Sequence, residues 1–125
     1  MDNEPTSINL ETKLASFSDH WHPKIISNFN GHDVMLVKVK GDFVWHSHPD
    51  TDDFFLVLKG TLRIDLRTPS GDTTHVELNP GELYIVPKGI EHRPVALDEV
   101  HVLLIEPIGT PNTGDPSTAA KKESI

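Results

Sequence analysis

Short runs of alternating apolar and polar residues, separated by turn residues, fill the chain from Lys24 to Glu106. The clearest run is residues 62–67, in which three aliphatic side chains alternate with three charged ones. Because successive side chains of a strand point to opposite faces, this pattern predicts a strand with one buried face and one face in water. Many short strands at close spacing predict a small all-β sandwich or barrel.

The turn residues divide this region into individual strands. Asn30-Gly31 is a strong hairpin signal, because a type I′ turn needs positive φ at both central positions. Residues 49–52 form a second turn-like segment, rich in Pro and Asp. The predicted strands are residues 24–29, 33–40, 43–48, 53–59, 62–67, 75–78, 83–86 and 100–106.

The two ends of the chain differ in composition from this middle part. Residues 1–6 are acidic and polar and are expected to be disordered, whereas residues 7–19 have loosely helix-spaced apolar positions and predict one short helix. After Ile108 the chain is rich in Gly, Thr, Pro and Asn, which predicts a tail that either packs along the body or is disordered. The predicted parts are an N-terminal segment with a short helix (1–19), a β-barrel domain (20–108) and a polar C-terminal tail (109–125).

Composition narrows the range of functions. A chain of 125 residues is long enough for one domain with a real core. The net charge of −8 argues against nucleic acid and anionic membrane as main partners. The absence of cysteine excludes disulfides, thiolate-bound zinc, iron–sulfur clusters and thiol nucleophiles. The sequence has no apolar leader and no stretch long enough to span a bilayer, so we expect a cytoplasmic protein.

The residue pattern with the most chemical content is a pair of histidines, His46 and His48, followed by the carboxylate of Asp53. In an extended chain, side chains two residues apart share a face, so both imidazoles can point at one place. A third histidine, His92, ends a second patterned stretch that begins at Gly81. Imidazole and carboxylate groups together suit a first-row transition metal. Taken alone, such a histidine pair is more often a pair of exposed strand residues.

The order of these residues resembles the two motifs of the cupin superfamily. The first motif is matched by Gly41, His46, His48, Asp53 and Gly60, and the second by Gly81, Pro87, Gly89 and His92. The resemblance implies a double-stranded β-helix, also called a jelly-roll barrel. It also implies one divalent transition metal per chain inside the barrel, with His46, His48, Asp53 and His92 as ligands. Iron, manganese, nickel, zinc and copper all remain open, because ligand type alone does not choose among them.

The carboxylate position departs from the family pattern, which has Glu where this chain has Asp53. An Asp side chain is one methylene shorter, so a longer metal distance, binding through water or a shifted backbone is expected. The neighbouring Asp52 is an alternative ligand. Strand alternation places Asp52 on the opposite face, and we therefore favour Asp53.

A cavity beside the metal is expected to be mostly apolar. Phe55 and Val57 share a strand face with Asp53 by the two-residue period. Tyr84 is expected to lie in the core or to line the pocket. Arg93 follows a candidate ligand histidine and is either a surface residue or a contact for an anionic substrate. His101 lies in an apolar strand and is either buried or lines the pocket. The predicted pocket-lining residues are Phe55, Val57, Tyr84, Arg93 and His101.

Two functions fit the predicted barrel with its metal site. The first is a metal-dependent enzyme that acts on a small organic molecule, and the resemblance favours oxygenase or isomerase chemistry. No general base outside the ligand set is apparent in the sequence. The second is a non-catalytic, metal-stabilised module that binds or senses a small ligand. The resemblance also implies a homodimer.

Overall fold

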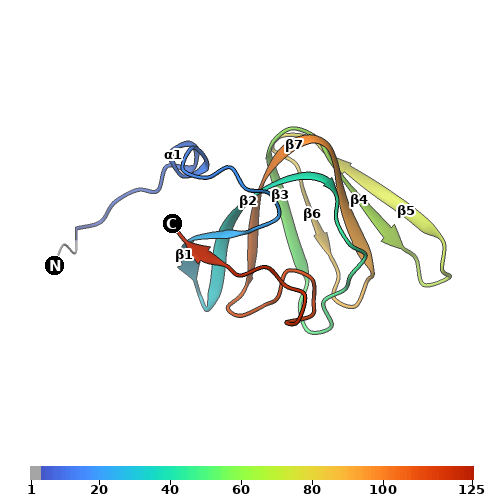
Figure 1. Cartoon of the computed structure of the whole chain (residues 1–125). Coiled ribbons are helices and arrows are strands. Elements are labelled where there is room, and N and C mark those ends of the chain that lie inside the picture. The colour runs from blue at the N-terminus through green and yellow to red at the C-terminus, as the bar shows by residue number, and fades with distance from the viewer. Residues whose placement is uncertain (1–3) are drawn as a thin grey trace.

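One short helix and eight strands make up the regular structure of residues 4–125, which are the residues that the computed structural model describes (Figure 1). Residues 1–3, half of the segment predicted to be disordered, lie outside the described residues. The elements are α1 (Leu10–Leu14), β1 (Lys24–Phe29), β2 (His32–Asp42), β3 (Asp53–Lys59), β4 (Leu62–Arg67), β5 (Thr73–Leu78), β6 (Leu83–Val86), β7 (His92–Pro107) and β8 (Glu123–Ser124). The predicted all-β fold with a short N-terminal helix is confirmed.

Strand β7 pairs with strands on both sides of the barrel. The strands follow the hydrogen-bonded order β5-β4-β7-β2-β1-β8, and β3 joins β6 to β7. The first residues of β7 pair with β4, whereas the later ones pair with β2 and β3. The long strand therefore belongs to both sides of the barrel, with β1 and β2 on one side and β4 and β5 on the other (Figure 1).

The β1–β2 hairpin has the tight turn that the sequence predicts. Asn30 and Gly31 both have positive φ, 49° and 75°, and Phe29 pairs directly with His32. This register turns Met35, Val37 and Val39 of β2 into the core. The core is completed by apolar residues of β3, β4 and β7, among them Val57, Ile64 and Val102.

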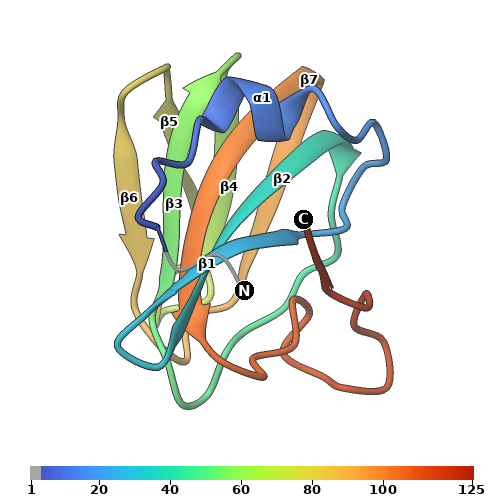
Figure 2. The same ribbon diagram turned by 90° about the vertical axis from the view of Figure 1, so that its left-hand side faces the viewer.

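The N-terminal segment covers the outer face of β2. Leu36 faces away from the barrel core but is fully buried. The next outward residue, Lys38, donates a hydrogen bond of 2.6 Å to the carbonyl of Phe17, and its ammonium group lies 4.8 Å from the centre of the Phe17 ring. Figure 2 shows α1 in front of this side of the sheet. Within residues 4–125, no helix is long and apolar enough to cross a membrane.

The structure corrects two predicted strands. Residues 43–48 form no strand and share only one isolated bridge with β7, between His46 and His92. Pro94 explains the interruption, because it has no N–H to donate to this ladder. The last long strand begins at His92 instead of Val100. Its first half was not predicted, because Pro94 and the charged residues 98–99 interrupt the strand pattern there.

The C-terminal segment packs along the body, which is one of the two predicted alternatives. Its last residues form β8, which runs parallel to β1. The Ile125 amide also donates to the Ile25 carbonyl at 3.0 Å. Figure 2 shows this segment, coloured dark red, looping beside β1 and β2 before it ends near β1.

Candidate metal centre

Four buried side chains converge inside the barrel: His46, His48, Asp53 and His92. Their candidate ligand atoms all lie within 4.8 Å of one another. The backbones of His46 and His92 are joined by a pair of hydrogen bonds, 3.0 and 2.9 Å long, which brings the loop before β3 against the start of β7. Asp53 is the first residue of β3, so the three supporting segments meet at this point.

Backbone carbonyl groups fix the orientation of two of the rings. His46 Nδ1 donates to the carbonyl of Val44, and His92 Nδ1 donates to the carbonyl of Ile90, both at 2.9 Å. A carbonyl oxygen only accepts, so Nδ1 carries the proton in each ring. The neutral ring then keeps a lone pair on Nε2. Metal-binding histidines usually donate their other ring N–H to a carbonyl or carboxylate in the same way.

The carboxylate of Asp53 lies against the Nε2 atoms of His92 and His48. Its Oδ2 atom is 2.8 Å from His92 Nε2 and 3.3 Å from His48 Nε2. His48 Nε2 is buried and has no hydrogen-bond partner of good geometry among the described residues. A lone pair facing a carboxylate oxygen at such distances is repulsive unless a positive charge lies between them. A proton or a divalent cation supplies that charge, and three nitrogens with one carboxylate suit the cation.

The surroundings keep two of these groups in the forms that metal binding needs. Burial, followed by the charge of His92, lowers the pKa of His46 to about 4, so this ring is neutral at physiological pH. Burial raises the pKa of Asp53, but its contacts with His48 and then His92 outweigh that effect and hold the pKa below its ordinary value. A neutral imidazole and an ionised carboxylate can bind a metal without first losing a proton.

Asp52, the alternative carboxylate, does not join this group. Its side chain is exposed and accepts a hydrogen bond of 2.9 Å from the backbone N–H of Lys88. The strand alternation that favoured Asp53 therefore places the two carboxylates as expected. Among the described residues, the carboxylate in the cluster is Asp53.

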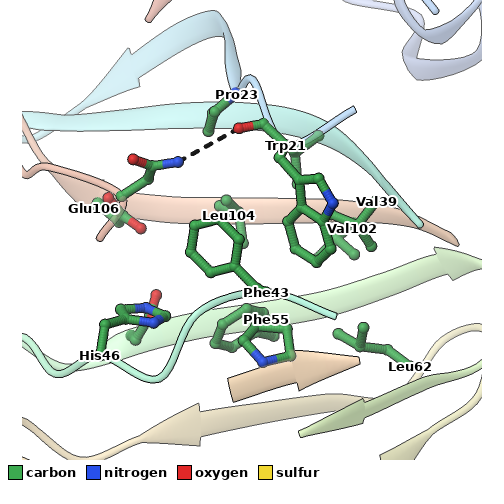
Figure 3. Close-up of a pocket in the computed structure, with 14 residues that line it drawn as sticks. Trp21, Pro23, Val39, Phe43, His46, Phe55, Leu62, Val102, Leu104 and Glu106 are labelled. Atoms are coloured by element: carbon green, nitrogen blue, oxygen red, sulfur yellow. Dashed lines mark hydrogen bonds between the residues drawn. The ribbon is translucent and has the colours of Figure 1, made fainter. Parts of the chain in front are cut away.

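An apolar cavity opens beside the cluster, and His46 and Asp53 form part of its wall (Figure 3). Its volume is about 50 Å³, so a bound molecule must be small. Trp21 and Phe43 stack with their ring centres 4.7 Å apart, and the edge of Phe43 meets the ring of His46 at 5.2 Å. These aromatic rings connect the apolar wall directly to the candidate ligands.

Of the five residues predicted to line the pocket, Phe55 lines this cavity. Val57 is fully buried in the core, and Tyr84 packs against the core from β6. Arg93 points to the outside of the barrel, where it binds Asp65 at 2.9 Å and lies over the ring of Trp45. His101 also faces outward, and its Nε2 atom lies 2.8 Å from Glu99. Strand alternation explains the outward positions, because His101 neighbours the inward-facing Val102.

A residue that the sequence did not single out, Glu106, also lines the cavity. Its side chain is only 3% exposed, and its Oε2 atom accepts a hydrogen bond of 3.3 Å from Lys122. Burial, and then the negative charge of Asp53, raise the pKa of Glu106 to about 7. The only feature of the sequence that could have indicated a role for Glu106 is its position, as a single carboxylate among aliphatic residues at the end of a strand. Its partner is 16 residues further on, in the polar tail.

Comparisons with known proteins agree with this architecture. Residues 33–106 match the sequence model of the Cupin domain. The uncharacterized protein YdbB of Bacillus subtilis (strain 168) is 40% identical over 84 residues, which cover 67% of this chain and 65% of that protein. The chain therefore spans slightly less than two thirds of this relative's length.

Three solved structures show the same fold. A cupin-2 domain containing protein from Shewanella frigidimarina NCIMB 400 is 44% identical with a TM-score of 0.75, over 80% of this chain and 93% of that one. Protein NMB1881 from Neisseria meningitidis is 34% identical with a TM-score of 0.68, over 81% and 98%. Hydroquinone 1,2-dioxygenase from Sphingomonas sp. TTNP3, solved with 4-hydroxybenzoate bound, is 21% identical with a TM-score of 0.74, over 89% and 34%. This last likeness concerns the fold alone.

Proposed function

The chain belongs to the cupin domain family, and on that premise we propose that it is a metal-dependent enzyme that acts on a small organic molecule. His46, His48, Asp53 and His92 would hold one divalent transition metal. A bound cation supplies Lewis acidity and, if it is redox-active, electron transfer. We propose oxygenase or isomerase chemistry, the classes that the resemblance of the two motifs to the cupin superfamily favours.

The observation that carries the proposal is the contact between the donor cluster and the cavity. Two of the four candidate ligands, His46 and Asp53, form part of the cavity wall. A molecule in the cavity therefore lies beside the metal position, with its apolar part against Trp21, Phe43 and Phe55. Small-molecule sites typically combine such an apolar wall with a few polar groups. A structural metal would not need this access, because its coordination is closed by protein ligands.

A ligand-binding or sensing module without turnover is the second candidate. The observation that favours it is the contribution of the C-terminal segment to the cavity wall. Asn112 lines the cavity and donates a hydrogen bond of 3.4 Å to the carbonyl of Trp21. The contact ties the C-terminal segment to the N-terminal one beside a potential ligand, which suits retention of that ligand.

The metal content of three proteins tests the site. We expect about one equivalent of metal per chain in the natural protein, purified without chelator and with and without oxygen. His48→Ala should lose the metal, because it removes a donor from the cluster. The matched control is His75→Ala, which changes an exposed histidine of β5 and should keep the metal. Full occupancy in His48→Ala would contradict the site.

The kind of metal then separates the chemistries. Iron, manganese, nickel or copper would support the hypothesis of an oxygenase, whereas zinc would favour an isomerase or the ligand-binding module. If a compound is consumed by the loaded natural protein but not by His48→Ala, the protein is an enzyme. Saturable binding of compounds without consumption of any would favour the second candidate.

We also propose that the chain forms a homodimer through the outer face of β3 and β6. Phe54 pairs with Ile85, and Leu56 lies between Leu83 and Leu103, so an apolar strip crosses three strands. Leu83 and Ile85 are 53% and 44% exposed in the single chain. Apolar sheet faces of this kind are typical of protein interfaces, and a two-fold axis through the strip would pack it against the same strip of a second copy.

Sedimentation or light scattering would test the dimer. Leu83→Glu combined with Ile85→Glu should give a monomer, since it places charge inside the interface. Leu97→Glu is the control, because Leu97 is 85% exposed on β7 outside this strip. A natural protein that sediments as a monomer would contradict the proposal.

A further inference from the structure

The polar groups of the cavity gather at one end. Figure 3 shows Glu106 and His46 together on one side, and Val39 and Leu62 at the other. The wall between them is formed by Trp21, Phe43 and Phe55 among other apolar residues. A ligand that fits must therefore have an apolar body and a polar group at one end.

Glu106 has one oxygen that the protein leaves open. Lys122 donates to Oε2, and Lys122 also donates to the carbonyl of Thr110, which holds the ammonium group in place. Within residues 4–125, no hydrogen bond to the other oxygen, Oε1, is formed. Because Lys122 occupies Oε2, Oε1 is the oxygen of Glu106 that can accept a hydrogen bond from a ligand in the cavity.

We propose that the ligand is a small uncharged molecule with an apolar body and one hydroxyl group, and that this hydroxyl donates its hydrogen bond to Glu106. The proposal rests on the function proposed above, and it adds the class of molecule and the residue that selects it. The apolar body lies against Trp21 and Phe43, and the hydroxyl end lies beside the metal position.

The charge state of Glu106 decides which ligand group fits. Burial and the negative charge of Asp53 favour the protonated form of Glu106, whereas Lys122 favours the ionised form, and a divalent cation at the neighbouring cluster would favour the ionised form further. An ionised carboxylate only accepts hydrogen bonds, so it can receive a hydroxyl proton donor but opposes a ligand carboxylate or carbonyl oxygen. No arginine lines the cavity to bind an anionic ligand, since all three arginines of the chain, Arg63, Arg67 and Arg93, lie outside it.

Lys122, which binds Glu106, and Asn112, which lines the cavity, both come from beyond the family's matched region. The match ends at residue 106, whereas Asn112 and Lys122 belong to the following segment. Lys122 acts as a positioning residue, because it fixes Oε2 and leaves Oε1 facing the ligand. The C-terminal segment therefore sets the ligand preference of the barrel.

The substitution Glu106→Gln gives a sharp test, because it reverses the polarity of the open position. Lys122 can only donate, so the amide oxygen of the variant takes the place of Oε2. The amide NH₂ group then takes the place of Oε1 and presents a donor to the ligand. The matched control is Glu77→Gln, the same change at an exposed residue of β5. Melting curves and metal content show that each variant is folded and loaded.

Binding of four single-ring probes to the zinc-loaded full chain would be measured by titration calorimetry. The probes are phenol, benzaldehyde, benzoate and toluene. The natural protein and Glu77→Gln should bind phenol about tenfold more tightly than toluene or benzaldehyde, the factor expected for one hydrogen bond to a charged group. Glu106→Gln should reverse the order of phenol and benzaldehyde. Lys122→Met should weaken phenol binding while toluene binding stays unchanged.

Several results would overturn the proposal. One is equal binding of phenol and toluene to the natural protein, or no binding of any probe. Another is preference for benzoate, which would mean an anionic ligand. A Glu106→Gln variant that keeps the phenol preference would also overturn it. These outcomes are separate from a failure of the proposed function, which would appear as a natural protein that takes up no metal.

Discussion

Gly114 is the position where a single methyl group should disturb both stability and the metal site. Its φ is +75°, and a Cβ added there would lie 2.0 Å from the carbonyl oxygen of Ser47. Ser47 stands between His46 and His48 in the chain. The C-terminal segment therefore packs, backbone against backbone, on the segment that presents two candidate ligands. Gly114→Ala forces these two segments apart.

The size of the effect follows from the geometry. Real Cβ atoms essentially never approach other atoms closer than 3.0 Å, so the two backbones must separate by at least 3.0 − 2.0 = 1.0 Å. The left-handed conformation costs an alanine about 1–2 kcal/mol, and overpacking costs about 1–3 kcal/mol more. We therefore expect Gly114→Ala to lose about 2–5 kcal/mol of unfolding free energy. Metal affinity should fall at least about tenfold, because ligand geometry must be held to well under 1 Å.

Gly109→Ala is the matched control in the same segment. Gly109 has a φ of +87°, but nothing lies within 4 Å of an added Cβ. It should therefore lose only the conformational cost of about 1–2 kcal/mol and keep its metal affinity. Urea unfolding followed by tryptophan fluorescence, together with metal titration, measures both quantities. Equal losses of stability in the two variants, with unchanged metal affinity, would refute the packing of Gly114 on Ser47.

Three further predictions follow from single side chains. Val57→Ala should lower the unfolding free energy by about 2–3 kcal/mol in urea without changing ligand affinity, because Val57 lies in the core and not in the cavity. Asp53→Asn should fold but bind metal much more weakly in a chelator competition, because it removes the one negative charge of the cluster. Glu106 has a folded-state pKa of about 7 against an ordinary 4.5, raised by burial and by Asp53 and opposed by Lys122 and His48. Between these two pKa values, Glu106 holds more protons in the folded metal-free protein than in the unfolded chain. The unfolding free energy of the metal-free protein should therefore fall as pH rises from about 4.5 to 7. In Glu106→Gln the unfolding free energy should depend less on pH over this range.

Local sequence patterns predict the strands whose own residues and flanking turns carry a clear signal. β1, β3, β4 and β6 begin and end at the predicted residues, and the Asn30-Gly31 turn has the expected backbone. In each case alternation and turn residues are contained in the strand itself or its flanks. Turn geometry fixes the register of the β1–β2 hairpin, so no distant partner was needed to predict it.

Elements whose start or end is decided by a distant residue, with no signal in their own sequence, could not be found this way. The extended appearance of residues 43–48 suggested a strand, but Pro94, nearly fifty residues away, lacks the N–H that would continue its ladder. β8 has two residues, too few for any pattern, and exists because β1 offers a free edge. The spacing of His46 and His48 still brought both rings to the cluster, since an extended backbone suffices for that without strand pairing.

Glu106 illustrates why the ligands were easier to recognise than the rest of the site. A metal needs several donors at short range, which leaves a spaced set of histidines in the sequence. A buried carboxylate needs only one cation, and that cation can come from anywhere in the chain. Here it is Lys122, in a segment whose polar composition resembles a disordered tail. Removing that segment would leave Glu106 buried without its cation, and breaking a buried pair in this way typically costs about 3–5 kcal/mol. The C-terminal segment is therefore tied to the barrel by the chemistry of the cavity, although its composition gives no sign of it.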